Sequence, residues 1–181
     1  DKLVVSNELL LYVYKSKLLA ENIDDDTYYR KLDKLIFASD FTIDTDNDGV
    51  PDLWRISNSK DGLLKIHIGD GAARITNQGE GTSYLITKKD INIQPGETYR
   101  VNLLIGSESP ENKPVINIYS RKGKSSQHQI KDLDLKQEIT NITTTFTATE
   151  DIEDGTQWIR IHLPKNIQEA ILIKGMEIWL E

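Results

Sequence analysis

The chain has 181 residues, of which 38% are hydrophobic and 28% are charged, and its formal net charge is −7. This length suits one full-sized domain with an appendage, and the composition is that of a globular protein. The acidic balance, without a basic stripe, argues against a nucleic-acid partner. No apolar run reaches the roughly 20 residues that cross a bilayer, so we expect no membrane insertion. The absence of cysteine excludes disulfides, thiol catalysis and thiolate metal sites.

Residues 1–37 predict a short helical segment in front of the main domain. The stretch SNELLLYVYKSKLLAEN is rich in helix formers, although its apolar run at 9–13 also fits a buried strand. The aspartates at 24–26 can cap a second helix at 27–36. The apolar side of this second helix comprises Tyr28, Tyr29, Leu32, Leu35 and Ile36.

So small a helical pair can hardly bury its own apolar faces. We therefore expect it to pack on the following domain, on copies of itself, or against other subunits of a larger assembly. The chain starts at Asp1 rather than at Met, which indicates a processed form or a piece of a longer protein.

The stretch DTDNDGVPDLW, residues 44–54, collects four aspartates in one short loop. Their charges repel one another, so a cation is expected among them. Alternating carboxylates around a turn at Gly49 fit the D-x-D-x-D-G-x-x-D pattern of calcium loops, and calcium prefers six to eight oxygens. The predicted Ca²⁺ ligands are the side chains of Asp44, Asp46 and Asp48, the carbonyl of Val50, and Asp52 directly or through a water.

An EF-hand does not fit this loop, because the twelfth position, where a bidentate glutamate is needed, is Arg55. A strand is also expected after the loop, where an EF-hand has a helix. The spacing resembles thrombospondin type 3-like loops instead. The alternative is a solvated acidic turn without an ion.

From about Leu35 onward the hydrophobic period changes to two, and residues 38–181 are predicted to form the main domain. Short β-rich runs alternate with turn residues such as Asp61-Gly62, Pro95-Gly96 and Asp154-Gly155. The runs are LLKIHIG, AARIT, SYLITKK, TYRVNLLIG, PVINIYS, ITTTFTAT, TQWIRIHL and ILIKGMEIWL. Eight or more strands with no convincing helix between them predict a mainly β fold, an antiparallel β-sandwich of the jelly-roll type.

Two of these runs supply candidate binding residues. Alternation puts one set of side chains on the core face and the other on the outer face. Flat aromatic rings beside planar hydrogen-bonding groups suit sugar rings. The alternative is an ordinary hydrated face, since the two strands need not be neighbours and a β-bulge near Gly155 would reverse the first assignment. The candidates are Trp158, Arg160 and His162 in TQWIRIHL, and Asn117, Tyr119 and Arg121 in PVINIYSRK.

Several stretches, in their order along the chain, resemble carbohydrate-binding modules of the family 4/9/22 type, which have a galactose-binding-like jelly roll. FASDFTIDTDNDGVPDLWRIS is similar to their first strand and loop, and PGETYRV, ITTTFTAT and ILIKGMEIWLE are similar to later strands. The resemblance covers about residues 35–181. It departs from the family at Lys174-Gly175, where an aspartate is usual.

The resemblance implies that the calcium is structural and that Trp54 is a core residue beneath the loop. No catalytic motif or metal-binding histidine spacing occurs, and we expect no enzyme activity. The resemblance further implies a non-catalytic carbohydrate-binding (adhesion) module of a larger extracellular, cell-surface or virion protein. Its partner would be a polysaccharide or cell-wall glycan. The alternative is a structural interaction module of a phage tail, baseplate or bacterial surface assembly without glycan binding, in which residues 1–37 are the connector.

Overall fold

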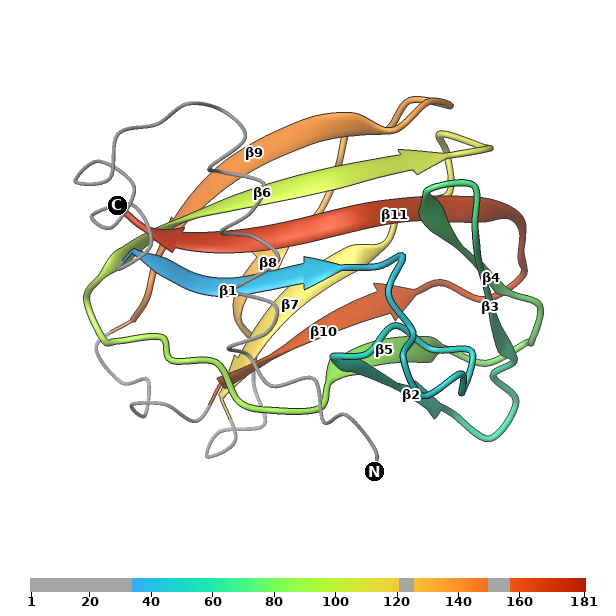
Figure 1. Ribbon diagram of the computed structural model, residues 1–181, viewed down its shortest axis with the longest axis horizontal. Helices are drawn as coiled ribbons and strands as arrows, with labels where there is room; N and C mark the ends of the chain where they lie inside the picture. The colour runs from blue at the N-terminus through green and yellow to red at the C-terminus, as the bar shows by residue number, and fades with distance from the viewer. Residues whose placement is uncertain (1–33, 121–125, 150–156) are drawn as a thin grey trace.

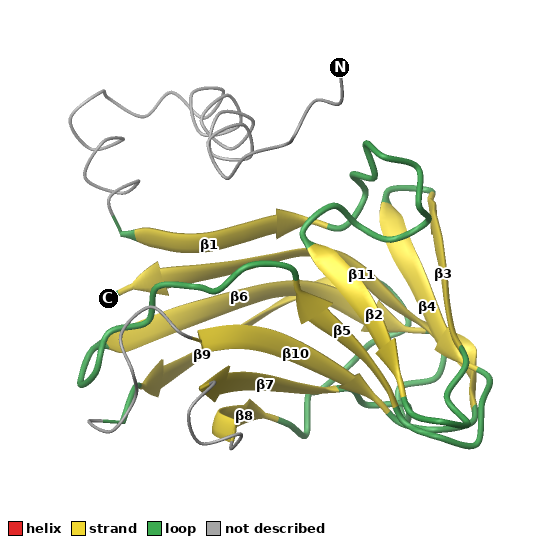
Figure 2. Cartoon of the chain, turned by 90° about the horizontal axis from the view of Figure 1, so that it is seen from below, coloured by secondary structure: helices red, strands yellow, loops and turns green. Residues whose placement is uncertain are grey.

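The computed structural model describes residues 34–120, 126–149 and 157–181. The predicted helical pair lies outside these ranges, apart from its last residues, and stays a prediction. The described residues form eleven β-strands in two antiparallel sheets, drawn in Figures 1 and 2. No helix long and apolar enough to span a membrane occurs in the described part of the chain.

Sheet A has six strands. Their order is β3 (Leu64–Gly69), β4 (Ala72–Asn77), β11 (Ile167–Leu180), β6 (Thr98–Ser107) and β9 (Thr140–Thr147), with β1 (Leu35–Asp40) also paired to β11. β11 is long enough to pair with both β4 and β1 along one side, because residues 171–173 face β4 and residues 175–179 face β1. Its other side pairs with β6 over most of its length.

Sheet B has five strands. Their order is β2 (Trp54–Asn58), β5 (Ser83–Thr87), β10 (Gln157–Leu163), β7 (Val115–Ser120) and β8 (Ser126–Ile130). Neighbours in this sheet are far apart in the sequence: β10 lies between β5 and β7, as Figure 1 shows. The antiparallel sandwich predicted from the period-two pattern is confirmed.

One boundary predicted from the sequence is wrong. Leu35 and Ile36, assigned to the end of the second helix, are the first two residues of β1. Leu35 is opposite Trp179 of β11, and a register shift separates it from the next pair, at Phe37. Three successive apolar residues have no period of their own, and pairing with β11 decides their conformation.

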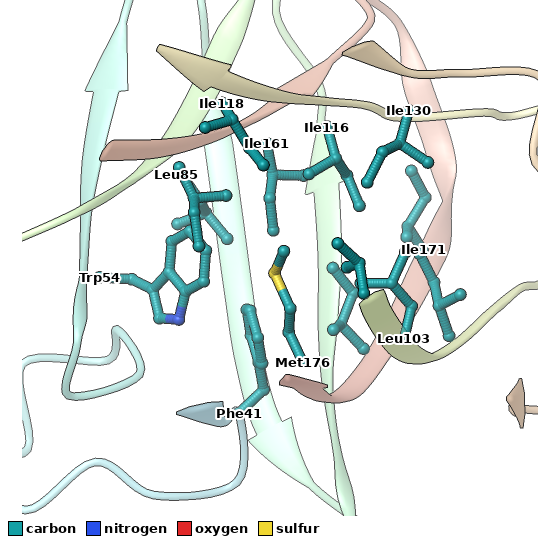
Figure 3. Packing of buried hydrophobic residues seen from close by; sticks show 14 of the residues in the cluster. Phe41, Trp54, Leu85, Leu103, Ile116, Ile118, Ile130, Ile161, Ile171 and Met176 are labelled. Atoms are coloured by element: carbon teal, nitrogen blue, oxygen red, sulfur yellow. The ribbon is translucent and has the colours of Figure 1, made fainter. Parts of the chain in front are cut away.

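The core lies between the two sheets. Figure 3 shows side chains of sheet B pointing toward those of sheet A. Ile116, Ile118 and Ile161 come from sheet B, and Leu103, Ile171 and Met176 come from sheet A. Trp54 closes one end of this core and is fully buried, as expected. Its indole Nε1 donates a hydrogen bond of 2.8 Å to Ser39 Oγ, and its ring centroid lies 5.0 Å from that of Phe41.

Asn77, at the end of β4, joins the turns at one end of the sandwich. It is fully buried. Its Nδ2 donates to the carbonyl oxygens of Gly81 and Pro164, each at 2.9 Å. Its Oδ1 accepts from the backbone of Leu63 and from Ser83 Oγ, each at 3.1 Å. One amide therefore connects β4 to the turns before β3 and β5 and to the turn after β10.

Changing Asn77 to Ala should destabilise the fold by about 3 kcal/mol or more, because it leaves several buried polar groups without partners. The equivalent change at Asn92, an exposed residue, should cost less than about 0.5 kcal/mol. Urea unfolding of both variants measures the difference. Equal midpoints would show that Asn77 does not hold the turns together.

Candidate functional site

β10 presents the first group of predicted residues on the outer face of sheet B. Burial alternates strictly along this strand. Ile159, Ile161 and Leu163 are buried in the core, as predicted. Trp158, Arg160 and His162 are half-buried on the opposite side. The bulge that would have reversed this assignment is therefore not found within β10.

β7 brings part of the second predicted group next to the first. Trp158 is opposite Tyr119 and Arg160 is opposite Asn117 in the antiparallel pairing. Directly opposite residues of such a pair project from the same face of the sheet. Ile116 and Ile118 are fully buried on the other side, as expected. The sequence left open whether these two strands are neighbours, and the fold places them side by side.

Two of the six candidates are described less completely. Tyr119 is placed by its backbone pairing alone, and Arg121 lies outside the described residues. Whether these residues bind a sugar stays a prediction.

Tyr84 on β5 belongs to the same face and was not among the predicted residues. It is opposite His162, and the two ring centroids are 5.1 Å apart. The guanidinium carbon of Arg160 lies 4.5 Å from the centroid of the Tyr84 ring, a cation–π contact. Alternation in SYLITKK gives the outward direction of Tyr84, but only the order of strands reveals that it adjoins β10.

Burial and a neighbouring arginine both act on His162. Burial lowers the pKa of His162 below its usual value, and the Arg160 charge lowers it further. Both effects disfavour the imidazolium. The pKa of His128, on β8, is lowered by burial, and its ring stacks on Phe146 with centroids 4.6 Å apart.

The aspartate loop connects β1 to β2. Asp44, Asp46 and Asp48 each offer a carboxylate oxygen, and these oxygens lie within 4.8 Å of one another. The loop curls through left-handed backbone at Asn47 (φ 56°) and Gly49 (φ 80°). Three convergent hard oxygens in a curled loop fit a cation such as calcium.

Asp52 has a different set of contacts. Its Oδ1 accepts a hydrogen bond of 2.7 Å from the backbone N–H of Thr45, and its Oδ2 accepts one of 3.0 Å from Thr45 Oγ1. In this arrangement Asp52 closes the base of the loop. Its role as a ligand, direct or through water, and that of the Val50 carbonyl stay predictions.

A cation from another part of the chain also approaches this loop. Lys88 Nζ lies 3.9 Å from Asp48 Oδ2. The sequence around residues 44–54 gives no hint of this contact, because Lys88 follows β5, which pairs with β2. A half-exposed ion pair at this distance contributes little, so Lys88 offsets only part of the repulsion.

The model of a carbohydrate-binding domain family, CBM4/9, matches residues 37–166. The chain belongs to this family. Carbohydrate-binding modules are in general non-catalytic and typically occur in secreted or surface proteins, and their family supports glycan binding. A search of curated proteins gave no match.

Solved structures of carbohydrate-binding modules share the fold. A CBM4 module is 17% identical, with a TM-score of 0.61 over 78% of this chain and 94% of its own. The CBM22-1 and GH10 modules of Clostridium thermocellum xylanase 10B, complexed with xylohexaose, are 11% identical, with a TM-score of 0.51 over 82% of this chain and 28% of theirs. The enzymatically active domain of bacteriophage CBA120 tailspike protein 4 is 8% identical, with a TM-score of 0.53 over 71% and 19%. At these identities the likeness shows the jelly-roll fold alone.

The lowered histidine pKa values predict that this carbohydrate-binding domain loses stability in mild acid. Below the ordinary histidine pKa of about 6.5 the unfolded chain binds more protons than the folded one. The two histidines therefore make their full contribution to stability above that pH. This contribution is lost as the pH drops toward their pKa values in the folded chain. His128→Phe should reduce the difference in Tm between about pH 7.5 and about pH 5.5. His67→Phe, on an exposed residue of β3, should leave it unchanged, and an equal effect of both changes would contradict this account.

Proposed function

We propose that this chain is a non-catalytic carbohydrate-binding (adhesion) module that holds a polysaccharide or cell-wall glycan against the outer face of sheet B. The observation that carries the proposal is the juxtaposition of Trp158 and Arg160 on β10 with Tyr84 on β5, beside Asn117 on β7, which is only 3% exposed. All four come from neighbouring strands at the centre of one sheet.

The chemistry of this face suits a sugar chain. Aromatic rings contact the C–H faces of pyranose rings, while amide and guanidinium groups bond their hydroxyl edges. Rigid strands hold these groups in fixed positions, which reduces the entropy lost on binding. Neighbouring strands lie about 4.8 Å apart, so groups on β5, β10 and β7 can contact consecutive parts of one glycan.

The calcium proposal rests on the aspartate loop. Asp44, Asp46 and Asp48 would bind Ca²⁺ together with the Val50 carbonyl and Asp52, and the ion would neutralise their repulsion. Its role would be structural. Val50 is buried, and the loop ends at Trp54 in the core, so ordering the loop orders one end of the sandwich.

The module would serve a larger extracellular, cell-surface or virion protein. The predicted helical segment in front of β1 would connect it to other subunits, because its apolar faces would need a partner. An interaction module of a phage tail, baseplate or surface assembly without glycan binding is the competing function, and it requires that no polysaccharide binds.

Calcium should raise the Tm of the chain, because an ion that binds only the folded state stabilises it by about 2.7 kcal/mol at about 100 times its Kd. Asp46→Ala should remove most of this gain, since it takes away one of three converging carboxylates. Asp61→Ala, on an exposed aspartate of another loop, should retain it. Differential scanning calorimetry with calcium and with EDTA makes the comparison, and identical Tm values for the wild type in both would reject the site.

Trp158→Ala should weaken polysaccharide binding by about tenfold or more. Its stability loss should stay below the roughly 3 to 5 kcal/mol of a fully buried aromatic, because Trp158 is half-buried. Trp54→Ala, at a fully buried site, should show the larger loss of stability. Affinity electrophoresis in soluble polysaccharides and urea unfolding give the two readouts. Unchanged binding with a large stability loss would make Trp158 a packing residue.

A further inference from the structure

A small pocket lies on the outer face of sheet A, on the other side of the sandwich from the proposed glycan face. It is at the end of β11, where β1 and β6 flank that strand (Figure 1). Its volume is about 250 Å³. The polar and aromatic residues of its described lining are Lys34, Arg100, Asn102, Glu177, Trp179 and Glu181.

Trp179 supplies the aromatic wall of this pocket. Pairing places it between Arg100 of β6 and Leu35 of β1. Its neighbour in the chain, Ile178, is buried in the core, so Trp179 points to the outer face. It is nevertheless only 8% exposed. The indole is therefore part of a recess in the surface, although the core between the sheets does not need it.

Glu177 is held in one orientation from two neighbouring positions. Asn102 Nδ2 and Trp179 Nε1 both donate to its Oε2, at 3.3 Å and 2.6 Å. Thr143 Oγ1 of β9 donates to Asn102 Oδ1 at 3.0 Å, which turns the Nδ2 of this amide toward Glu177. The network therefore positions the carboxylate across three strands.

The second oxygen of Glu177, Oε1, has no hydrogen-bond donor among the described residues. Burial raises the pKa of Glu177, and the hydrogen bond from Trp179 opposes this rise. A carboxylate oxygen that has lost part of its water and has no protein donor is stabilised by a hydroxyl group that donates to it. The pocket thus combines an apolar ring with a fixed acceptor.

The charged side chains of the pocket balance one another. Arg100 and Lys34 are positive, and Glu177 and Glu181 are negative. Arg100 Nε lies 3.4 Å from Glu181 Oε1. A ligand of either charge would gain no net attraction, whereas a neutral ligand with hydroxyl groups would find both donors and acceptors.

We propose that this pocket is a second carbohydrate-binding site, which takes a single neutral sugar ring. Trp179 would contact its C–H groups, Glu177 would accept from its hydroxyls, and Arg100 would donate to them. The pocket is smaller than the roughly 300 to 1,000 Å³ of most ligand sites, which suits one ring rather than a chain. The inference goes beyond the proposed function, because it uses the other sheet and does not involve Trp158.

NMR titration of the full 181-residue chain tests the site, because each of the three tryptophans has its own indole N–H signal. Trp179→Phe and Trp158→Phe identify two of these signals. The probes are the methyl glycosides of glucose, xylose, galactose, mannose and N-acetylglucosamine, with glycerol as a control for a non-specific polyol. We expect at least one sugar to shift the Trp179 signal saturably, with a Kd of about 1 to 10 mM, and glycerol to leave it unchanged.

Glu177→Gln should weaken this binding about tenfold, because it replaces the charged acceptor by an amide of the same shape. Glu169→Gln is the matched control. Glu169 is an exposed residue near the other end of β11, and its change alters the net charge equally. This control and Trp158→Ala should both leave the Kd at the Trp179 signal unchanged.

The outcomes separate this inference from the proposed function. No saturable shift of the Trp179 signal of the unmodified chain with any of the five sugars would overturn the inference. Equal effects of Glu177→Gln and Glu169→Gln would also overturn it. Shifts confined to the Trp158 signal would leave only the site on sheet B. Saturable shifts of Trp179 in a chain that binds no polysaccharide through Trp158 would support the inference and reject the proposed function of sheet B.

Discussion

The pairing of β11 with strands on both of its sides is the constraint on which the rest of the sandwich depends. This one strand pairs with β4, β1 and β6, and β6 in turn holds β9. Register shifts near Ile167 and Gly175 let its first part follow β4 and its last part follow β1. Its inward residues, including Ile171, Ile173 and Met176, form much of the sheet A side of the core. Sheet A is therefore assembled around the last strand of the chain.

Sheet B depends on this arrangement through its buried face and its turns. The isoleucines of β7 and β10 pack against the core-facing side chains of β11 and β6. Asn77, at the end of β4, also binds the carbonyl of Pro164, which follows β10. Together these contacts place β10 between β5 and β7. The aromatic, amide and guanidinium groups of the outer face become neighbours as a consequence of core packing on the other side of the same strands.

The two candidate sites have different physical characters. The outer face of sheet B is a set of groups on rigid strands that are far apart in the sequence. The aspartate loop is a local concentration of charge, in which carboxylate oxygens of Asp44, Asp46 and Asp48 lie within 4.8 Å of one another. Trp54 links them, because it follows the loop, begins β2 and lies in the core directly beside Arg55 of the outer face.

The sequence by itself determined the antiparallel sandwich, the buried isoleucines of β7 and β10 and the position of Trp54, because these follow from a local period of two and from volume. The aspartate cluster was likewise visible, since its residues are close in the chain. Only the tertiary structure decided that β7 and β10 are neighbours, that Tyr84 joins them, that Lys88 approaches Asp48, and that Leu35 and Ile36 are in a strand. These depend on pairing between segments far apart in sequence, and a local pattern shows which way a side chain points but not which strand lies beside it.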